Sequence, residues 1–145
     1  MKKGMIIAVA AVLAVSLFAL AACSSPKTEP SAGSSAADSS QSDAYHKIDA
    51  EEGKQMIDTG NVTIVDVRTP EEYASGHIPG AINIPNEDIG SQQPAELSDL
   101  EETLIVYCRT GVRSKQASDK LIAIGYKNVY DMGGIVDWPY DTVKE

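Results

Sequence analysis

A short segment in the second half of the chain combines a nucleophile with positive charge. Its residues are Cys108, Arg109, Thr110, Gly111, Val112 and Arg113, in a protein whose formal net charge is −9. A cysteine thiolate is a strong nucleophile, and nearby cations favour the thiolate over the thiol. The local reversal of charge therefore predicts a reactive cysteine that handles an anionic substrate.

The elements on either side of Cys108 are expected to help position it. Residues 103–107 form an aliphatic run typical of a buried strand, and residues 112–124 are predicted to form a helix that ends before Gly125. Gly111 permits a tight turn between them. Such a turn aims several amide N–H groups at one point, where the helix dipole is positive. The predicted result is an anion-binding loop.

The spacing alone leaves a second interpretation open. A lone cysteine at a strand end is often a small hydrophobic core residue. Arg109 and Arg113 are equally compatible with solvated positions at the start of a helix.

Strands and helices alternate through the rest of the folded part. Strands are predicted at 45–48, 62–67, 81–84, 103–107 and a short one at 128–130. Helix starts are predicted at Asp49 and Thr69, each followed three residues later by a glutamate that can complete a capping box. Residues 86–99 are polar and predicted to be irregular, with a helical turn near Leu97. The alternation predicts an α/β fold: a small open, mainly parallel sheet with helices on both faces.

Four motifs, in order along the chain, resemble the single-domain rhodaneses. The segment from Cys108 to Ser114 resembles the family's active-site loop. The other motifs are Asp66-Val67-Arg68 with Glu71-Glu72-Tyr73, Gly76 to Pro85, and Gly133-Gly134 with Trp138. The resemblance spans about Tyr45 to Trp138 and implies an open parallel sheet and a persulfide-forming cysteine.

The resemblance also implies a reaction and a division of roles. Cys108 would take sulfane sulfur from a donor such as thiosulfate and pass it to cyanide or a thiol, without a cofactor or metal. Arg109 and Arg113 would orient the donor, and Arg113 would also help to hold the loop. Thr110, Gly111 and Val112 would contribute backbone amides. The motif residues interpreted as structural are Asp66, Arg68, His77 and Trp138.

Other activities remain as alternatives. A rhodanese-like domain can be a catalytically silent binding or sensing module. A phosphatase or arsenate reductase also uses a cysteine in an anion-binding loop, but its arginine comes six residues after the cysteine, whereas Arg113 comes five after Cys108. A Cys108–His77 dyad is a further alternative. A thiol–disulfide oxidoreductase is disfavoured because no Cys-x-x-Cys is present.

The N-terminal part predicts export and anchoring. Residues 1–22 carry Lys2 and Lys3 followed by an uncharged apolar run, the pattern of a signal peptide. The run ends in Leu-Ala-Ala-Cys, which resembles a lipobox and implies lipidation of Cys23. Residues 23–44 read as a lipidated start and a disordered Ser/Ala-rich tether, and residues 45–145 as the rhodanese-like domain. We expect an extracytoplasmic, lipid-anchored protein; an uncleaved membrane anchor is the alternative.

Composition limits the partners. The 145 residues include 21 acidic and 12 basic side chains, and such a surface repels nucleic-acid phosphates. Two cysteines and two histidines, distant from one another in sequence, make a metal centre improbable. We expect a monomer that binds a small-molecule sulfur donor and acceptor.

Overall fold

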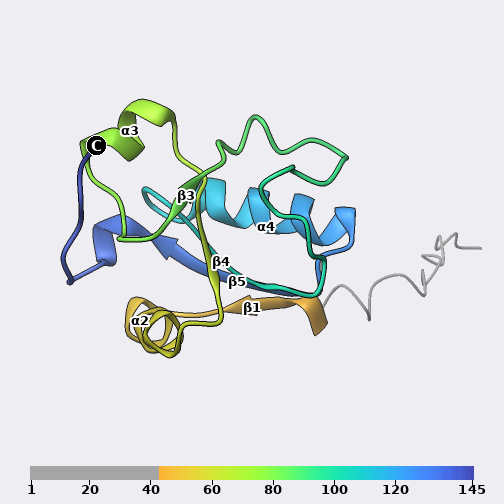
Figure 1. The fold of residues 1–145 in the computed structure, drawn as a ribbon, viewed down its shortest axis with the longest axis horizontal. Coiled ribbons are helices and arrows are strands. Elements are labelled where there is room, and N and C mark those ends of the chain that lie inside the picture. The colour runs from red at the N-terminus through yellow and green to blue at the C-terminus, as the bar shows by residue number, and fades with distance from the viewer. Residues whose placement is uncertain (1–42) are drawn as a thin grey trace, which may run out of the picture. The chain divides into compact units, whose positions relative to one another are not determined.

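A five-stranded, fully parallel sheet forms the centre of the domain (Figure 1). The computed structural model describes residues 43–145, so the predicted signal peptide, Cys23 and almost all of the tether lie outside the described residues. The strands are β1 (Tyr45–Lys47), β2 (Thr63–Asp66), β3 (Ile82–Asn83), β4 (Thr103–Cys108) and β5 (Asn128–Gly134). Their order across the sheet is β1-β5-β4-β2-β3, which confirms the predicted fold class.

The helices begin and end close to the predicted residues. They are α2 (Ala50–Thr59), α3 (Pro70–Ser75), α4 (Val112–Ile124) and a 3-10 turn, η1 (Ile135–Asp137). The Asp49 side chain accepts a hydrogen bond from the Glu52 amide and so caps α2. At α3, Thr69 and Glu72 form a complete capping box.

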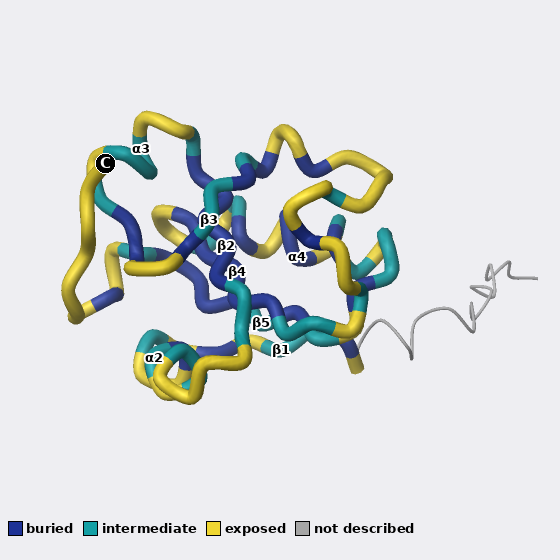
Figure 2. The backbone as a smooth tube through the Cα atoms, in the orientation of Figure 1, coloured by how far each residue is buried: buried dark blue, intermediate teal, exposed yellow. Residues whose placement is uncertain are grey.

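Two apolar clusters pack on opposite faces of the sheet. Alternate side chains of β4 supply both, because successive residues of a strand point to opposite faces. Leu104, Val106 and Cys108 join the cluster that α4 covers, whereas Ile105 and Tyr107 join the one beneath α2. In Figure 2, buried residues predominate in the central strands β2, β4 and β5, whereas the edge strands β1 and β3 are partly exposed.

The segment between β3 and β4 is irregular but anchored. Ile89 and Leu97 are fully buried in the cluster beneath α4. The Leu97 carbonyl accepts hydrogen bonds from Gln93 and from the Tyr126 hydroxyl. Within residues 43–145, no helix has the length and apolar character needed to span a membrane.

The structure corrects the predicted end of the last strand. We expected a strand over 128–130, but β5 continues to Gly134. Its pairing with β4 shifts register between Val106 and Tyr107, so that Tyr107 faces Gly133 and Cys108 faces Gly134. A strand can absorb such an irregularity without ending, and the glycine pair therefore belongs to the sheet. Cys108 itself is the last residue of β4.

Candidate active site

Cys108 lies at the carboxyl end of β4, directly before the loop that leads into α4. Its sulfur accepts a hydrogen bond from the Gly111 amide, with 3.1 Å between N and Sγ. Gly111 has a φ of 101°, a left-handed conformation that a residue with a Cβ adopts only at a cost. The predicted glycine turn thus brings an amide donor onto the sulfur.

Cys108 is also deeply buried. Only 1% of the residue is exposed, and it belongs to the apolar cluster beneath α4. The sulfur therefore has an apolar environment on one side and the Gly111 amide on the other. Neither of the two cavities described below is lined by Cys108.

The Cys108 loop packs against the backbone of Gly133 and Gly134 at the end of β5, which we call the seat. A Cβ on Gly134 would lie 2.6 Å from the Arg109 carbonyl oxygen and 2.8 Å from Thr110 Cα. A Cβ on Gly111 would lie 3.6 Å from Gly133 Cα. The Val136 amide donates to the Arg109 carbonyl at 3.3 Å. The glycine pair therefore allows the two backbones to approach closely.

The two arginines of the loop have different surroundings. Arg113 makes a two-pronged ion pair with Glu72, with distances of 2.6 and 3.0 Å. Hydrogen bonding to Arg113 lowers the pKa of Glu72 to about 2, and hydrogen bonding to Glu72 raises the pKa of Arg113. Arg109 is exposed and takes part in none of the ion pairs within residues 43–145. Arg113 thus connects the loop to α3, while the charge of Arg109 faces solvent.

Three residues in contact with this loop or its flanks are absent from the sequence-based set of candidates. Glu72 was expected only to cap α3, yet it also pairs with Arg113. The Ser114 hydroxyl donates to Asp131 Oδ1 at 2.6 Å. Glu72 and Asp131 lie 41 and 17 residues from their partners, so no local pattern connects them.

The other motif residues make contacts away from the sulfur. Arg68 donates to both carboxylate oxygens of Asp66 and to the Gly76 carbonyl. His77 stacks on the Tyr73 ring at 3.7 Å, and its Nδ1 lies 3.0 Å from the Tyr73 carbonyl oxygen. Within residues 43–145, no hydrogen bond joins His77 to Cys108. These contacts connect the ends of β2 and α3.

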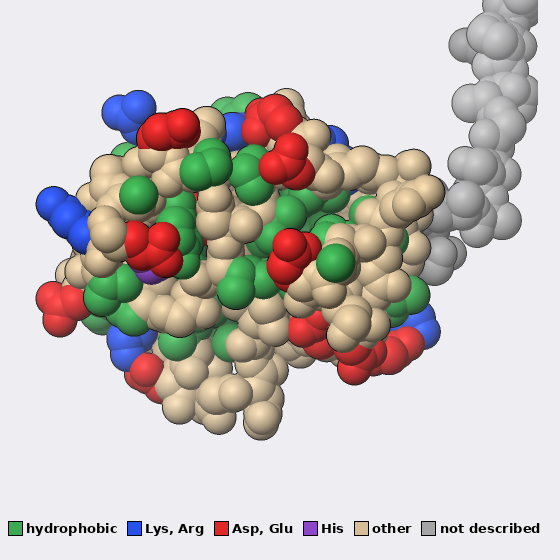
Figure 3. Space-filling model, turned by 45° about the horizontal axis from the view of Figure 1, so that its top comes forward, with side chains coloured by type: hydrophobic (Ala, Val, Ile, Leu, Met, Phe, Trp, Pro, Cys, Tyr) green, Lys and Arg blue, Asp and Glu red, His purple; other side chains and the backbone are tan. Residues whose placement is uncertain are grey.

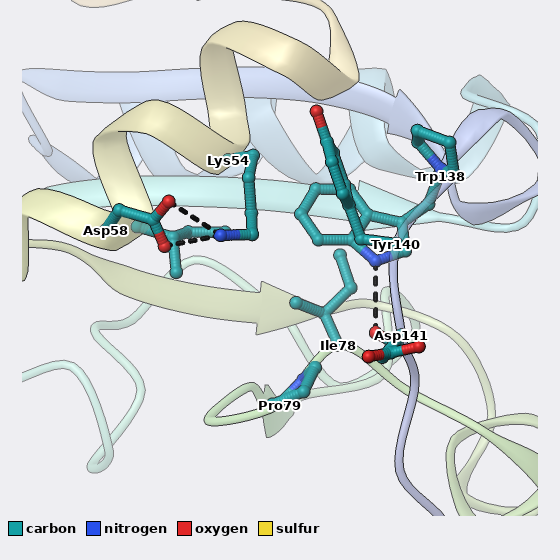
Figure 4. A pocket seen from close by; sticks show the side chains of 9 residues that line it. Lys54, Asp58, Ile78, Pro79, Trp138, Tyr140 and Asp141 are labelled. Carbon is teal, nitrogen blue, oxygen red and sulfur yellow. Dashed lines mark hydrogen bonds and ion pairs between the residues drawn. The ribbon is translucent and has the colours of Figure 1, made fainter.

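Two open cavities lie elsewhere on the domain. One, of about 540 Å³, is bounded by α2, the turn before β3 and the segment after η1. Figure 4 shows its Lys54–Asp58 ion pair and the Trp138 indole N–H that donates to the Asp141 carbonyl. The second, of about 520 Å³, adjoins Thr110 and Gly111 on the side of the start of α2.

The loop brings two basic side chains, Arg109 and Arg113, close to Cys108 in a strongly acidic protein. Asp and Glu side chains are spread over the face drawn in Figure 3. No group of three or more His, Cys, Asp or Glu side chains comes together as a metal site within the described 43–145 region. The groups that the structure places around the Cys108 sulfur are the Gly111 amide and, from the same segment of chain, the side chains of Arg109 and Arg113.

Comparison with known proteins agrees with this geometry. A family model described as "Rhodanese-like domain" matches residues 49–140. A solved structure of a rhodanese with anions from E. coli is 38% identical, covers 58% of this chain and 99% of its own, and has a TM-score of 0.53. A human single-domain sulfurtransferase is 30% identical, with coverages of 63% and 93% and a TM-score of 0.58.

Similar sequences also occur inside larger proteins. The tRNA uridine(34) hydroxylase of Yersinia pestis is 35% identical over 98 residues. The match covers 64% of this chain but only 28% of the length of that relative.

Proposed function

Because the chain belongs to the rhodanese-like family, we propose that it is a sulfurtransferase that carries sulfane sulfur on Cys108. The donor is an anion of the thiosulfate type, and the acceptor is a thiophile such as cyanide or a thiol. The observation that carries this proposal is the Gly111 amide, 3.1 Å from the Cys108 sulfur.

The proposed reaction has two displacement steps at sulfur. In the first, the Cys108 thiolate attacks the outer sulfur of thiosulfate; a new S–S bond forms, the old one breaks, and sulfite leaves with the electron pair. In the second, the acceptor attacks the outer sulfur of the persulfide and the Cys108 thiolate leaves. With cyanide the product is thiocyanate. Because one substrate leaves before the next reacts, the kinetics are ping-pong.

The loop can stabilise the charged states of this cycle. An amide donor to sulfur is worth more when the acceptor is an anion than when it is neutral. The first turn of a helix also leaves amide groups without partners inside the helix, and α4 begins at Val112. A buried site strengthens both effects because less water screens the charge. The burial of Cys108 thus favours a small donor.

The acidic surface bears on the choice of substrate. The larger relatives are named for an activity on tRNA uridine(34), but the formal charge of −9 opposes a polyanionic partner. We therefore propose small-molecule substrates for this chain. The leader pattern of residues 1–22 and Cys23 supports a lipid-anchored, extracytoplasmic location as part of the same proposal.

The burial of Cys108 favours a second candidate function. A cysteine that is only 1% exposed and lines neither described cavity is compatible with a catalytically silent binding module. The two candidates differ in whether small reagents reach the sulfur of the native protein.

Intact mass spectrometry tests the proposal. After incubation with thiosulfate, the protein should gain the mass of one sulfur atom, and cyanide should remove it. The Cys108→Ser variant is the control and should show no gain. If the native protein gains no sulfur and iodoacetamide fails to label Cys108 near neutral pH, the silent module is the correct assignment.

A further inference from the structure

A buried carboxylate lies directly beneath the Cys108 loop. Asp131, on β5, is 2% exposed. Its Oδ1 accepts hydrogen bonds from the Ser114 hydroxyl at 2.6 Å and from the Gly133 amide at 3.0 Å. Its Oδ2 accepts from the Tyr45 hydroxyl at 2.8 Å and lies 3.4 Å from Lys47 Nζ.

The two partners of Oδ1 lie on either side of Gly111. Ser114 is in the first turn of α4, and its hydroxyl oxygen is also 3.0 Å from the Gly111 carbonyl oxygen. Gly133 belongs to the seat formed by β5 and is the residue against which Gly111 packs. Asp131 Oδ1 therefore connects the first turn of α4 to the seat, and Gly111 lies between these two segments.

We propose that Asp131 is a positioning residue that keeps the Gly111 amide directed at the sulfur of Cys108. The proposal rests on the sulfurtransferase function above and adds a residue that neither the loop motif nor the reaction identifies. Within residues 43–145, no hydrogen bond joins Asp131 to the sulfur, so it acts through Ser114 and Gly133.

The surroundings of Asp131 allow a charged side chain to be buried at this position. Burying a carboxylate is unfavourable unless hydrogen bonds and a counter-charge compensate, and Asp131 has all of these. Bonds to an ionised acceptor are short and strong, which restrains both partners. Burial and the hydrogen bond to Asp131 raise the pKa of the Tyr45 phenol, so Tyr45 remains a donor at neutral pH.

Three variants separate positioning from stability. Asp131→Ala removes both bonds of Oδ1, whereas Asp131→Asn can retain them because its amide oxygen can take the place of Oδ1. Tyr45→Phe removes a partner of Oδ2 and leaves Oδ1 unchanged. Each variant is made in the full chain, and its thermal unfolding is recorded so that every assay is run on folded protein.

Two readouts are compared. The first is kcat/KM for transfer from thiosulfate to cyanide; it should fall by about 10- to 100-fold in Asp131→Ala and stay within about threefold of wild type in Asp131→Asn. The second is the pH profile of Cys108 alkylation by iodoacetamide. Its midpoint should move upward in Asp131→Ala, but not in Asp131→Asn or Tyr45→Phe, even where Tyr45→Phe lowers the unfolding temperature.

The alkylation profile does not depend on sulfur transfer, so the two proposals can fail separately. If wild-type protein transfers no sulfur but Cys108 is alkylated, the proposed function is wrong and the alkylation profile still tests Asp131. If Cys108 is neither loaded with sulfur nor alkylated, both proposals are wrong. If Asp131→Ala does not fold, Ser114→Ala removes the α4 side of the connection and should give the same upward shift. A wild-type alkylation profile in folded Asp131→Ala, or in Ser114→Ala if Asp131→Ala does not fold, would overturn the assignment.

Discussion

Glu72 and Arg113 show how one pair of side chains can serve both the fold and the site. Glu72 closes the capping box of α3 and holds the guanidinium that follows Cys108 by five residues. Their side chains are 28% and 26% exposed, so solvent screens the pair only partly. Replacing either residue affects the position of the loop as well as its charge.

The pH dependence of stability tests this pair. Because Arg113 lowers the pKa of Glu72 from 4.5 to about 2 in the folded protein, the stabilisation is fully present above pH 4.5 and is lost as the pH falls toward 2. Glu72→Gln should lower the free energy of unfolding at pH 7 by about 1 kcal/mol. In this variant, the free energy of unfolding should also decrease less than in wild type as the pH is lowered from 4.5 to 2.

Denaturant unfolding at a series of pH values measures this effect. Glu101→Gln is the matched control, because it removes the carboxylate of the Lys127–Glu101 pair, whose side chains are 64% and 63% exposed. This control should change stability by less than about 0.5 kcal/mol at pH 7. Parallel pH curves for wild type and Glu72→Gln would contradict the expected role of the Glu72–Arg113 pair.

Arg113 also bears on donor binding. Expressed as free energies, the loss of kcat/KM for thiosulfate in Arg113→Ala should exceed the loss of folding stability. The substitution removes a cation near Cys108, and it also frees Glu72, whose negative charge then repels the anionic donor. In the double variant Glu72→Gln with Arg113→Ala, part of the loss should be recovered. Steady-state kinetics on the single and double variants measure the difference. A double variant no better than Arg113→Ala would show that the freed carboxylate has no effect on the donor.

At the scale of elements, the close approach of β5 and the Cys108 loop leaves no room for a side chain at Gly134. Gly134→Ala should destabilise the protein by about 1–3 kcal/mol, because its Cβ would meet backbone atoms of Arg109 and Thr110 that cannot rotate away. Gly134→Ala should also reduce sulfur transfer by the folded protein, because the added Cβ displaces the Cys108 loop.

A glycine with free space provides the control for Gly134. A Cβ on Gly90 would meet no atom within 4 Å, so Gly90→Ala should change stability by less than about 0.5 kcal/mol. Thermal unfolding of both variants gives the comparison. Equal unfolding temperatures for the two variants would mean that the Cys108 loop can accommodate a Cβ at Gly134 without loss of stability.

The elements were largely predictable because their signals are local. Gly125 ends α4, and Thr69 with Pro70 starts α3, as the capping patterns predict. The apolar run of β4 correctly placed Cys108 at a strand end. The length of β5 was not predictable, because Asp131 and Gly133 are residue types that strands disfavour, and their pairing with Val106 and Tyr107 of β4 keeps them in the strand.

The site was predictable only where its residues are contiguous. The segment from Cys108 to Arg113 predicted the turn at Gly111, which the structure contains, but not the burial of Cys108; the role of Cys108 as nucleophile stays a prediction. Glu72 and Asp131 reach this segment through tertiary packing, and their spacing along the chain contains no information about that packing. His77 and Trp138, which the motifs also contain, lie in contacts remote from the sulfur.

At the scale of the whole molecule, the net charge of −9 acts on every anionic substrate that approaches. For thiosulfate, long-range repulsion should be screened as salt increases from low to physiological concentration, so kcat/KM should rise by about two- to threefold. Alkylation by iodoacetamide, which is uncharged, should be nearly insensitive to salt. Stopped-flow or steady-state rates across a salt series measure both reactions. A decrease in kcat/KM for thiosulfate with increasing salt would show that attraction by Arg109 and Arg113 outweighs repulsion by the net charge.

The strand order has a consequence for synthesis on the ribosome. β5 follows the other four strands of the sheet along the chain, yet it lies between β1 and β4 and pairs with both. Until residues 128–134 leave the exit tunnel, β1 has no neighbour, and β4 exposes an open edge of N–H and C=O groups. The nascent chain therefore cannot complete this sheet until residues 128–134 have been made, and a chain truncated before Asn128 would present both edges to chaperones and proteases.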